Sequence, residues 1–222
     1  AVHRPYRMAL SHLRAAGIGW APDLPCTAAC PPEELHVLER QLERGLNCVP
    51  TSSMGRLFDA VSSLAGICHR AGYEAQAAIE LEGAAYRAHG DGRGDAGGHG
   101  YAFGLHLPPD SGGGPLAADP APVLAAVVAD VRAGTDPALI AARFHTSVAA
   151  LVTALCGAAR ERHGLDTVAL TGGVFANTLL SSACARLLRA RGFTVLRHGR
   201  IPPNDGGLAL GQLMVAAAHD TP

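Results

Sequence analysis

Two glycine-containing turns near the C-terminus have the residue types and spacing of a ligand-binding crevice. The first lies within residues 170–177 and the second within residues 201–211. Each turn follows a short β-like run and precedes a helix-like run, and α/β proteins bind phosphorylated ligands at such strand ends. The two turns therefore predict one crevice at the ends of adjacent parallel strands.

The first turn offers backbone groups to a ligand. Gly172 and Gly173 have no Cβ to block a close approach, and the next helix presents free N–H groups suited to phosphate oxygens. Asn177 falls in the first turn of that helix. Its amide could bind a ribose or a base, or it could only cap the helix, and the spacing does not choose between these roles.

The second turn contains an acidic residue, Asp205, between Asn204 and Gly206. A carboxylate is unfavourable beside a phosphate unless a cation lies between them, so Asp205 is a candidate metal ligand. The alternative is that Asp205 caps the following helix, and the spacing favours that simpler role.

A third candidate segment spans residues 51–59. Gly55 would permit close approach of a ligand, and Asp59 lies one helical turn further on, where its carboxylate could accept both hydroxyls of a ribose. Ser52 or Ser53 would cap this helix. The alternative is that Asp59 is a solvent-facing carboxylate, and spacing alone does not exclude it.

For the other residues that could take part in chemistry, the sequence favours structural roles. His145 lies inside an apolar helix, where a lone histidine is usually a core residue. Cys26 and Cys30 form an isolated C-x3-C pair, whereas structural zinc needs four ligands. The glycine-rich run 90–100 lacks the Lys-Ser/Thr of a phosphate loop, so we interpret residues 90–114 as loops around a short strand at 101–107.

The remaining periodicity predicts the elements that position these residues. A Pro- and Cys-rich loop is expected at 21–32, and strands are expected at 167–170 and 193–196. Helices are expected at 3–17, 32–42, 55–65, 74–89, 120–133, 137–156, 177–191 and from 206 onward. This order predicts an α/β fold with right-handed parallel crossovers.

Composition limits the class of protein. The 222 residues are 48% hydrophobic with a net charge of −1 and no basic stripe, which favours a packed core and argues against nucleic-acid binding. No apolar run of transmembrane length is evident, so no membrane span is expected. Six scattered cysteines favour reduced thiols and a cytoplasmic location. The first residues are neither an initiator methionine nor a signal peptide, which suggests a piece of a longer protein.

Five ordered segments together resemble the HypF-type hydrogenase maturation carbamoyltransferases, which are related to the tRNA threonylcarbamoyl transferases. The resemblance covers nearly the whole chain. Its segments are Ser52-Ser53-Met54-Gly55-Arg56-Leu57-Phe58-Asp59-Ala60-Val61, Tyr73-Glu74-Ala75-Gln76-Ala77-Ala78, Ala141-Ala142-Arg143-Phe144-His145, Gly172-Gly173-Val174-Phe175-Ala176-Asn177 and Pro202-Pro203-Asn204-Asp205-Gly206-Gly207-Leu208-Ala209-Leu210-Gly211-Gln212.

The resemblance implies a fold and an activity. Residues 1–222 would form the C-terminal lobe of a two-lobed, actin-like ATPase (ribonuclease H-like) domain, truncated on its N-terminal side. This lobe would have parallel βα units with helical and loop insertions. Domains absent from this chain would make carbamoyl-adenylate from carbamoyl phosphate and ATP. The last domain would pass the carbamoyl group to the C-terminal cysteine of the partner protein HypE, for synthesis of the cyanide ligand of nickel–iron hydrogenase.

The resemblance also implies roles for individual residues. Gly55 and Asp59 would hold the nucleotide ribose, and Gly172, Gly173 and Asn177 would hold its adenosine and phosphate side. A divalent metal, iron or zinc, would be bound by Asp205, with Asn204 as a one-residue alignment alternative. The metal site would be completed by the family's paired histidines, which are absent from this chain.

Two smaller departures from the family pattern are Ala75, where a glycine usually follows Tyr-Glu, and Ala176, where a glutamine commonly precedes the asparagine. Two other functions stay open. One is an O-carbamoyltransferase that acts on a sugar hydroxyl, and the other is a non-catalytic lobe that docks a nucleotide or a partner protein.

Overall fold

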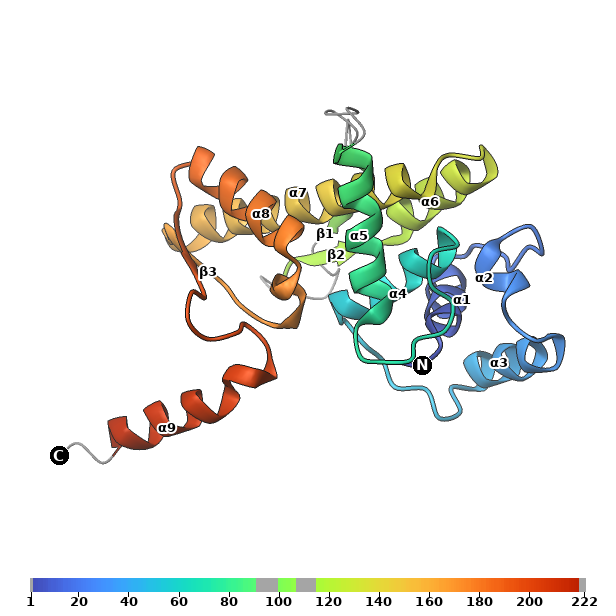
Figure 1. Ribbon diagram of the computed structural model, residues 1–222, viewed down its shortest axis with the longest axis horizontal. Coiled ribbons are helices and arrows are strands. Elements are labelled where there is room, and N and C mark those ends of the chain that lie inside the picture. Colours follow the sequence, from blue (N-terminus) through green and yellow to red (C-terminus); the bar gives the residue numbers. More distant parts are fainter. Residues whose placement is uncertain (1, 91–99, 107–114, 220–222) are drawn as a thin grey trace. The chain divides into compact units, whose positions relative to one another are not determined.

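The computed structural model describes residues 2–90, 100–106 and 115–219 (Figure 1). The chain forms two compact units, Ala1–Leu151 and Val152–Pro222. The expectations for the glycine-rich segments 90–100 and 110–114 fall almost entirely outside the described residues.

The first unit is mainly helical. Its helices are α1 (Pro5–Ala15), α2 (Pro25–Ala28), α3 (Pro32–Arg44), α4 (Met54–Leu64), α5 (Gln76–Gly90), α6 (Ala121–Arg132) and the first part of α7 (Pro137–His163). Prolines begin several of them, because a proline at the first helical position sacrifices only an N–H that has no helical partner. The sequence predicted all of these helices except α2, which lies inside the segment 21–32 that was expected to be a loop.

Helix α4 lies at the centre of the first unit and packs against α1, α5 and α6. Its apolar residues Leu57, Phe58, Val61 and Leu64 recur at helical spacing and are buried. The edge of the Phe58 ring meets Phe144 of α7, with ring centroids 4.9 Å apart. These contacts fix α4, and with it the candidate residues at its N-terminal end.

A short antiparallel pair of strands belongs to the same unit. Strand β1 (Gly104–His106) pairs with β2 (Ala117–Asp119), with Gly104 opposite Asp119. The sequence predicted β1 but not β2. Three residues without a β-branched or aromatic side chain give no strand signal of their own, so β2 exists only through its pairing.

Helix α7 is long and apolar enough to cross a membrane by length and composition, although the sequence analysis expected no such segment. In the most apolar window of α7, 56% of the residues are buried within the fold. Ile140, Phe144 and Val148 lie in the core of the first unit. This burial is typical of a core helix.

The second unit is built on two parallel strands. Its elements are β3 (Thr167–Leu170), the 3-10 turn η1 (Gly173–Ala176), α8 (Thr178–Ala190), β4 (Thr194–Arg197), the 3-10 turn η2 (Asp205–Gly207) and α9 (Leu208–His219). Strands β3 and β4 pair in parallel, with Thr167 opposite Thr194 and Leu170 opposite Arg197. The predicted βαβ unit is therefore confirmed, and both glycine turns follow its strands.

The second unit has a small core of its own. Leu180, Cys184 and Leu188 project from one face of α8 and are buried, together with Leu170 at the end of β3. The Arg160 guanidinium covers the Phe193 ring at 3.4 Å from its centroid. These contacts hold α8 and the two strand ends in place.

Candidate functional site

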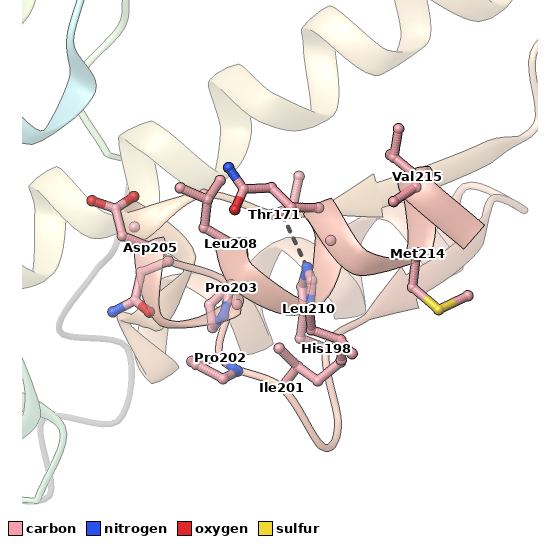
Figure 2. A pocket seen from close by; sticks show the side chains of 17 residues that line it. Thr171, His198, Ile201, Pro202, Pro203, Asp205, Leu208, Leu210, Met214 and Val215 are labelled. Carbon is pink, nitrogen blue, oxygen red and sulfur yellow. Dashed lines mark hydrogen bonds between the residues drawn. The ribbon is translucent and has the colours of Figure 1, made fainter. Parts of the chain in front are cut away.

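The two glycine turns lie side by side and enclose one groove. The backbone N–H of Gly172 donates a hydrogen bond of 2.8 Å to the carbonyl of Pro203, which joins the turn after β3 to the turn after β4. A groove of about 950 Å³ opens along these turns and α9 (Figure 2). The sequence prediction of a shared crevice at adjacent strand ends is confirmed.

The groove is polar near the strand ends and apolar along α9. The Thr171 hydroxyl and His198 Nε2 are hydrogen bonded at 2.9 Å, and Figure 2 shows this pair within the groove. Asp205 lies at one end of the view, whereas Met214 and Val215 of α9 line the other. A ligand with a polar part and a flat apolar part fits this division.

Two glycines in the turns are required by geometry. Gly172 has φ +95°, which L-residues with a Cβ rarely adopt. A Cβ at Gly207 would lie 2.9 Å from the Pro202 carbonyl oxygen and 2.9 Å from Ile201 Cγ2. The glycines therefore allow the chain to turn sharply and allow η2 to pack on the segment before it.

Asn177 caps the helix that follows the first turn. Its backbone is extended, and its Oδ1 accepts a 2.8 Å hydrogen bond from the N–H of Leu180. The capping role is confirmed, and a ligand contact by the same side chain stays a prediction. Asn177 is not a lining residue of the groove in the described part of the chain.

The cap of the second turn is Asn204 rather than Asp205. Asn204 Oδ1 accepts a hydrogen bond of 3.1 Å from the N–H of Gly206, whereas Asp205 is exposed in the first turn of η2. The simpler role that the sequence favoured for Asp205, as the cap, is wrong. The reason is that the extended backbone that an N-cap needs occurs one residue earlier.

The described residues do not form a metal centre by themselves. No group of three or more histidine, cysteine or carboxylate side chains lies close enough to hold an ion among residues 2–90, 100–106 and 115–219. Asp205 provides one carboxylate, and the side-chain oxygen of Asn204 already accepts a backbone hydrogen bond. A metal bound here would need ligands beyond those residues.

The candidate residues of the first unit lie at the start of α4. Asp59 is buried with 3% of its surface exposed, and its Oδ2 lies 2.8 Å from Arg56 Nη1. Burial raises the pKa of Asp59, and the charge of Arg56 opposes that rise. The solvent-facing alternative for Asp59 is therefore wrong. Gly55 is half-buried beside this pair.

The Tyr73-Glu74-Ala75-Gln76 segment has a structural role at the start of α5. Gln76 Oε1 accepts a 2.7 Å hydrogen bond from the N–H of Gly72, and Gln76 Nε2 donates a 2.6 Å hydrogen bond to Glu80. Ala75 has φ +61°. Glycine adopts this conformation without strain, which explains why the family pattern usually has a glycine at this position.

The remaining polar candidates are core residues, as the sequence favoured. His145 is buried, and its Nδ1 is hydrogen bonded to the carbonyl of Ala141 at 2.8 Å. Cys26 and Cys30 are buried free thiols, and burial raises the pKa of Cys26 to about 11.

Sequence reasoning missed two features of the site. His198 follows β4 directly, and only the parallel pairing of β3 and β4 brings it to Thr171. Arg56 was noticed only as part of a motif, although an arginine three residues before an aspartate on a helix is a recognisable ion-pair signal.

The fold and groove define a helix-rich α/β protein with a ligand groove between two turns at parallel strand ends. The chain belongs to the carbamoyltransferase family, in the Kae1-like domain, second subdomain, whose family model matches residues 1–212. It is 40% identical to carbamoyltransferase HypF of Rhodobacter capsulatus, over 96% of this chain and 25% of that protein. It is 36% identical to carbamoyltransferase HypF2 of Cupriavidus necator, over 97% of this chain and 28% of that protein.

A solved structure has a similar fold. The crystal structure of full-length HypF in the phosphate- and nucleotide-bound form superposes with a TM-score of 0.83 and 27% identity, over 100% of this chain and 27% of that one. The chain therefore spans about a quarter of the length of the relatives that it matches.

Proposed function

We propose that this chain is the C-terminal lobe of a two-lobed, actin-like domain that transfers a carbamoyl group during the maturation of nickel–iron hydrogenase. In this proposal the donor is carbamoyl-adenylate, made from carbamoyl phosphate and ATP elsewhere in the full polypeptide. The acceptor is the C-terminal cysteine of a HypE-type partner.

One observation carries the proposal. The hydrogen bond from Gly172 to Pro203 closes the two turns onto one groove, in a chain that belongs to a carbamoyltransferase family. Helix-like segments begin at Gly173 and Asp205 beside this groove. Backbone N–H groups at such starts are suited to the phosphate of an adenylate. The full-length HypF that superposes on this chain was crystallised with phosphate and nucleotide bound, which supports the same ligand class here.

The chemistry requires a positioned mixed anhydride rather than a nucleophile from this lobe. The partner's thiolate attacks the carbamoyl carbon, a C–S bond forms, and the bond from that carbon to the phosphate oxygen breaks. The adenylate leaves with the electron pair, and N–H donors near its phosphate would stabilise the charge that develops there.

The proposal assigns the candidate residues as follows. Gly172, Gly173 and Asn177 would hold the adenosine and phosphate side, and Gly55 and Asp59 would hold the ribose. Asp59 Oδ2 faces Arg56, and its other carboxylate oxygen makes no hydrogen bond to a described residue, so that oxygen is the candidate for a ribose hydroxyl. Asp205 would contribute one ligand to a divalent metal completed from outside the described residues.

Calorimetric titration of the chain with ATP and with a stable carbamoyl-adenylate analogue tests the proposal, with and without divalent metal. We expect saturable binding that is weakened about tenfold or more in Asn177→Ala, because a ligand contact and a helix cap are lost together. Thr178→Ala, which alters the next residue but not the cap, is the control and should bind like the wild type.

Two results would contradict the proposal. Absence of saturable binding by a folded wild-type chain would remove the nucleotide site from this lobe. Binding that is unchanged in both Asn177→Ala and Asp59→Ala would remove the assigned residues. Carbamoylation of a sugar hydroxyl instead of a peptide thiol by the full polypeptide would favour the O-carbamoyltransferase alternative.

A further inference from the structure

His198 and Thr171 form a hydrogen-bonded pair at the carboxyl ends of the two parallel strands. Leu170 of β3 lies opposite Arg197 of β4. Thr171 and His198 are the next residues along the two strands. Thr171 Oγ1 and His198 Nε2 are 2.9 Å apart, and both residues line the groove (Figure 2). Ligands of α/β folds bind outside the carboxyl ends of parallel strands, so this pair lies where a bound substrate is expected.

One nitrogen of the His198 ring stays available to a ligand. Nε2 is hydrogen bonded to Thr171, whereas Nδ1 makes no hydrogen bond to a described residue. When Nε2–H donates to the threonine oxygen, the neutral ring carries its lone pair on Nδ1. A histidine held through one nitrogen and free at the other has the arrangement that a catalytic base requires.

The proposed reaction needs such a base. An ordinary cysteine thiol has a pKa of about 8.5, so roughly one thiol in thirty is ionised at pH 7, and the thiolate is the nucleophile. Among the described residues that line the groove, His198 and Asp205 have titratable side chains. A carboxylate is a much weaker base than an imidazole, which accepts protons near neutral pH. His198 is therefore the lining residue suited to ionise an incoming thiol.

The pair also lies beside the turn that the proposed function assigns to the adenylate. Thr171 directly precedes Gly172, and η1 begins at Gly173. A phosphate bound by the N–H groups at the start of η1 would place the mixed anhydride at the same strand ends as His198. The base and the reacting carbon would then meet in one part of the groove.

We propose that His198 is the general base that ionises the acceptor thiol, and that Thr171 positions its ring. This inference rests on the proposed function, which supplies the thiol and the carbamoyl-adenylate. The S–H proton passes to Nδ1, and the S–H electron pair stays on sulfur. The sulfur attacks the carbamoyl carbon, a C–S bond forms, and the C–O bond to the phosphate breaks with its electron pair on the adenylate. The imidazolium then loses its proton to solvent, since His198 is exposed.

The test measures carbamoyl transfer by the full polypeptide to its partner protein, whose last residue is either cysteine or selenocysteine. His198→Ala should lower transfer to cysteine about ten- to thirtyfold at pH 7, because the variant depends on the fraction of thiol that is already ionised. This loss should shrink as the pH rises past the thiol pKa of about 8.5. A selenol is already ionised at neutral pH, so transfer to selenocysteine should stay within about twofold of the wild-type rate.

Two variants test the positioning role of Thr171. Thr171→Val keeps the shape of the side chain but removes the oxygen that holds Nε2, so transfer to cysteine should fall about threefold or more. Thr171→Ser keeps the hydroxyl and should recover most of the activity. The matched control is His163→Ala, which removes an exposed imidazole of the second unit that does not line the groove, and it should transfer at the wild-type rate. Carbamoyl-adenylate formation, measured as pyrophosphate released from ATP, should be unchanged in all four variants.

The outcomes separate this inference from the proposed function. A loss in His198→Ala that is equal for both acceptors, or that stays constant with pH, would mean that the pair only joins the two turns, and would overturn the inference. Unchanged transfer would overturn it as well. A matching loss of carbamoyl-adenylate formation would make His198 a nucleotide contact, and would overturn the inference alone. A wild-type polypeptide that forms carbamoyl-adenylate but carbamoylates neither acceptor would overturn the proposed function and this inference with it.

Discussion

Ala75 has a backbone conformation that its side chain disfavours. Its φ of +61° lies in the left-handed region, which costs an L-residue about 1–2 kcal/mol. We predict that Ala75→Gly stabilises the chain by about 0.5–1 kcal/mol, since relief of this strain exceeds the added entropy of the unfolded chain. Urea unfolding measures the change. Ala77→Gly, at a buried position inside α5, should instead destabilise, and a destabilised Ala75→Gly would contradict the prediction.

At the level of single residues, the sequence predicts roles that depend on local backbone geometry but not roles that depend on packing. The spacing identified Asn177 as a cap or a ligand, and the cap is confirmed because it depends only on local backbone geometry. Burial of Asp59 could not be predicted, because it depends on how the other helices pack around α4. The same holds for the contact between His198 and Thr171, which are distant in the sequence.

Glu34 connects α3 to α1. It accepts hydrogen bonds from Arg4 and Tyr6 and pairs with Arg7. Burial alone would raise the pKa of Glu34, but the hydrogen bonds from Arg7, Tyr6 and Arg4 together with the charge of Arg7 hold that pKa below its ordinary value of 4.5. A lowered carboxyl pKa stabilises the fold above the ordinary pKa, and this contribution is lost as the pH falls through the folded-state value.

We therefore predict that Glu34→Gln lowers the free energy of unfolding by about 1 kcal/mol at pH 7. The difference from the wild type should begin to shrink near pH 4.5, where the carboxyl of the unfolded chain becomes protonated, and should be lost as the pH falls through the lower pKa of the folded state. Chemical unfolding at several pH values measures this difference in the free energy of unfolding. Glu33→Gln, at the exposed neighbouring position, is the control. A difference that stays constant from pH 7 to pH 3 would exclude the ion pairs as its cause.

The turn between β4 and α9 depends on the small size of Gly207. A Cβ there would lie 2.9 Å from a backbone oxygen, so we predict that Gly207→Ala destabilises the second unit by about 1–3 kcal/mol. Gly211→Ala is the matched control, because no atom lies within 4 Å of its new Cβ and alanine favours a helix. Hydrogen exchange of the β3 and β4 amides measures the stability of the second unit in both variants. Equal protection in the two variants would contradict the predicted clash.

Among the helices and strands, the sequence predicted those with a strong pattern of their own. Strands β3 and β4 are short apolar runs between polar segments, and their parallel pairing follows from the helix between them. Helix α2 and strand β2 have no such pattern and form only through contacts with distant residues. The division into two compact units is likewise a property of packing rather than of local sequence.

Helix α9 of the second unit exposes several large apolar side chains, which form its apolar surface. The exposed side chains are Leu208, Leu210, Leu213, Met214 and Val215. Leu213 and Met214 are 67% and 64% exposed, which is unusual for neighbouring apolar residues. We predict that the chain binds the dye ANS at this surface, and that Leu213→Glu with Met214→Glu removes most of the dye fluorescence. The two charges interrupt the surface without touching a buried residue.

Val37→Glu provides the matched control for this prediction. Val37 is 56% exposed on α3, where Leu38 is the buried residue and most of the other side chains are polar. Its replacement should leave the ANS fluorescence unchanged. Circular dichroism should give the same helix content for all variants, since the substituted side chains contribute nothing to a core. Equal fluorescence from the wild type and the α9 variant would show that the dye does not bind at α9, and would contradict the prediction.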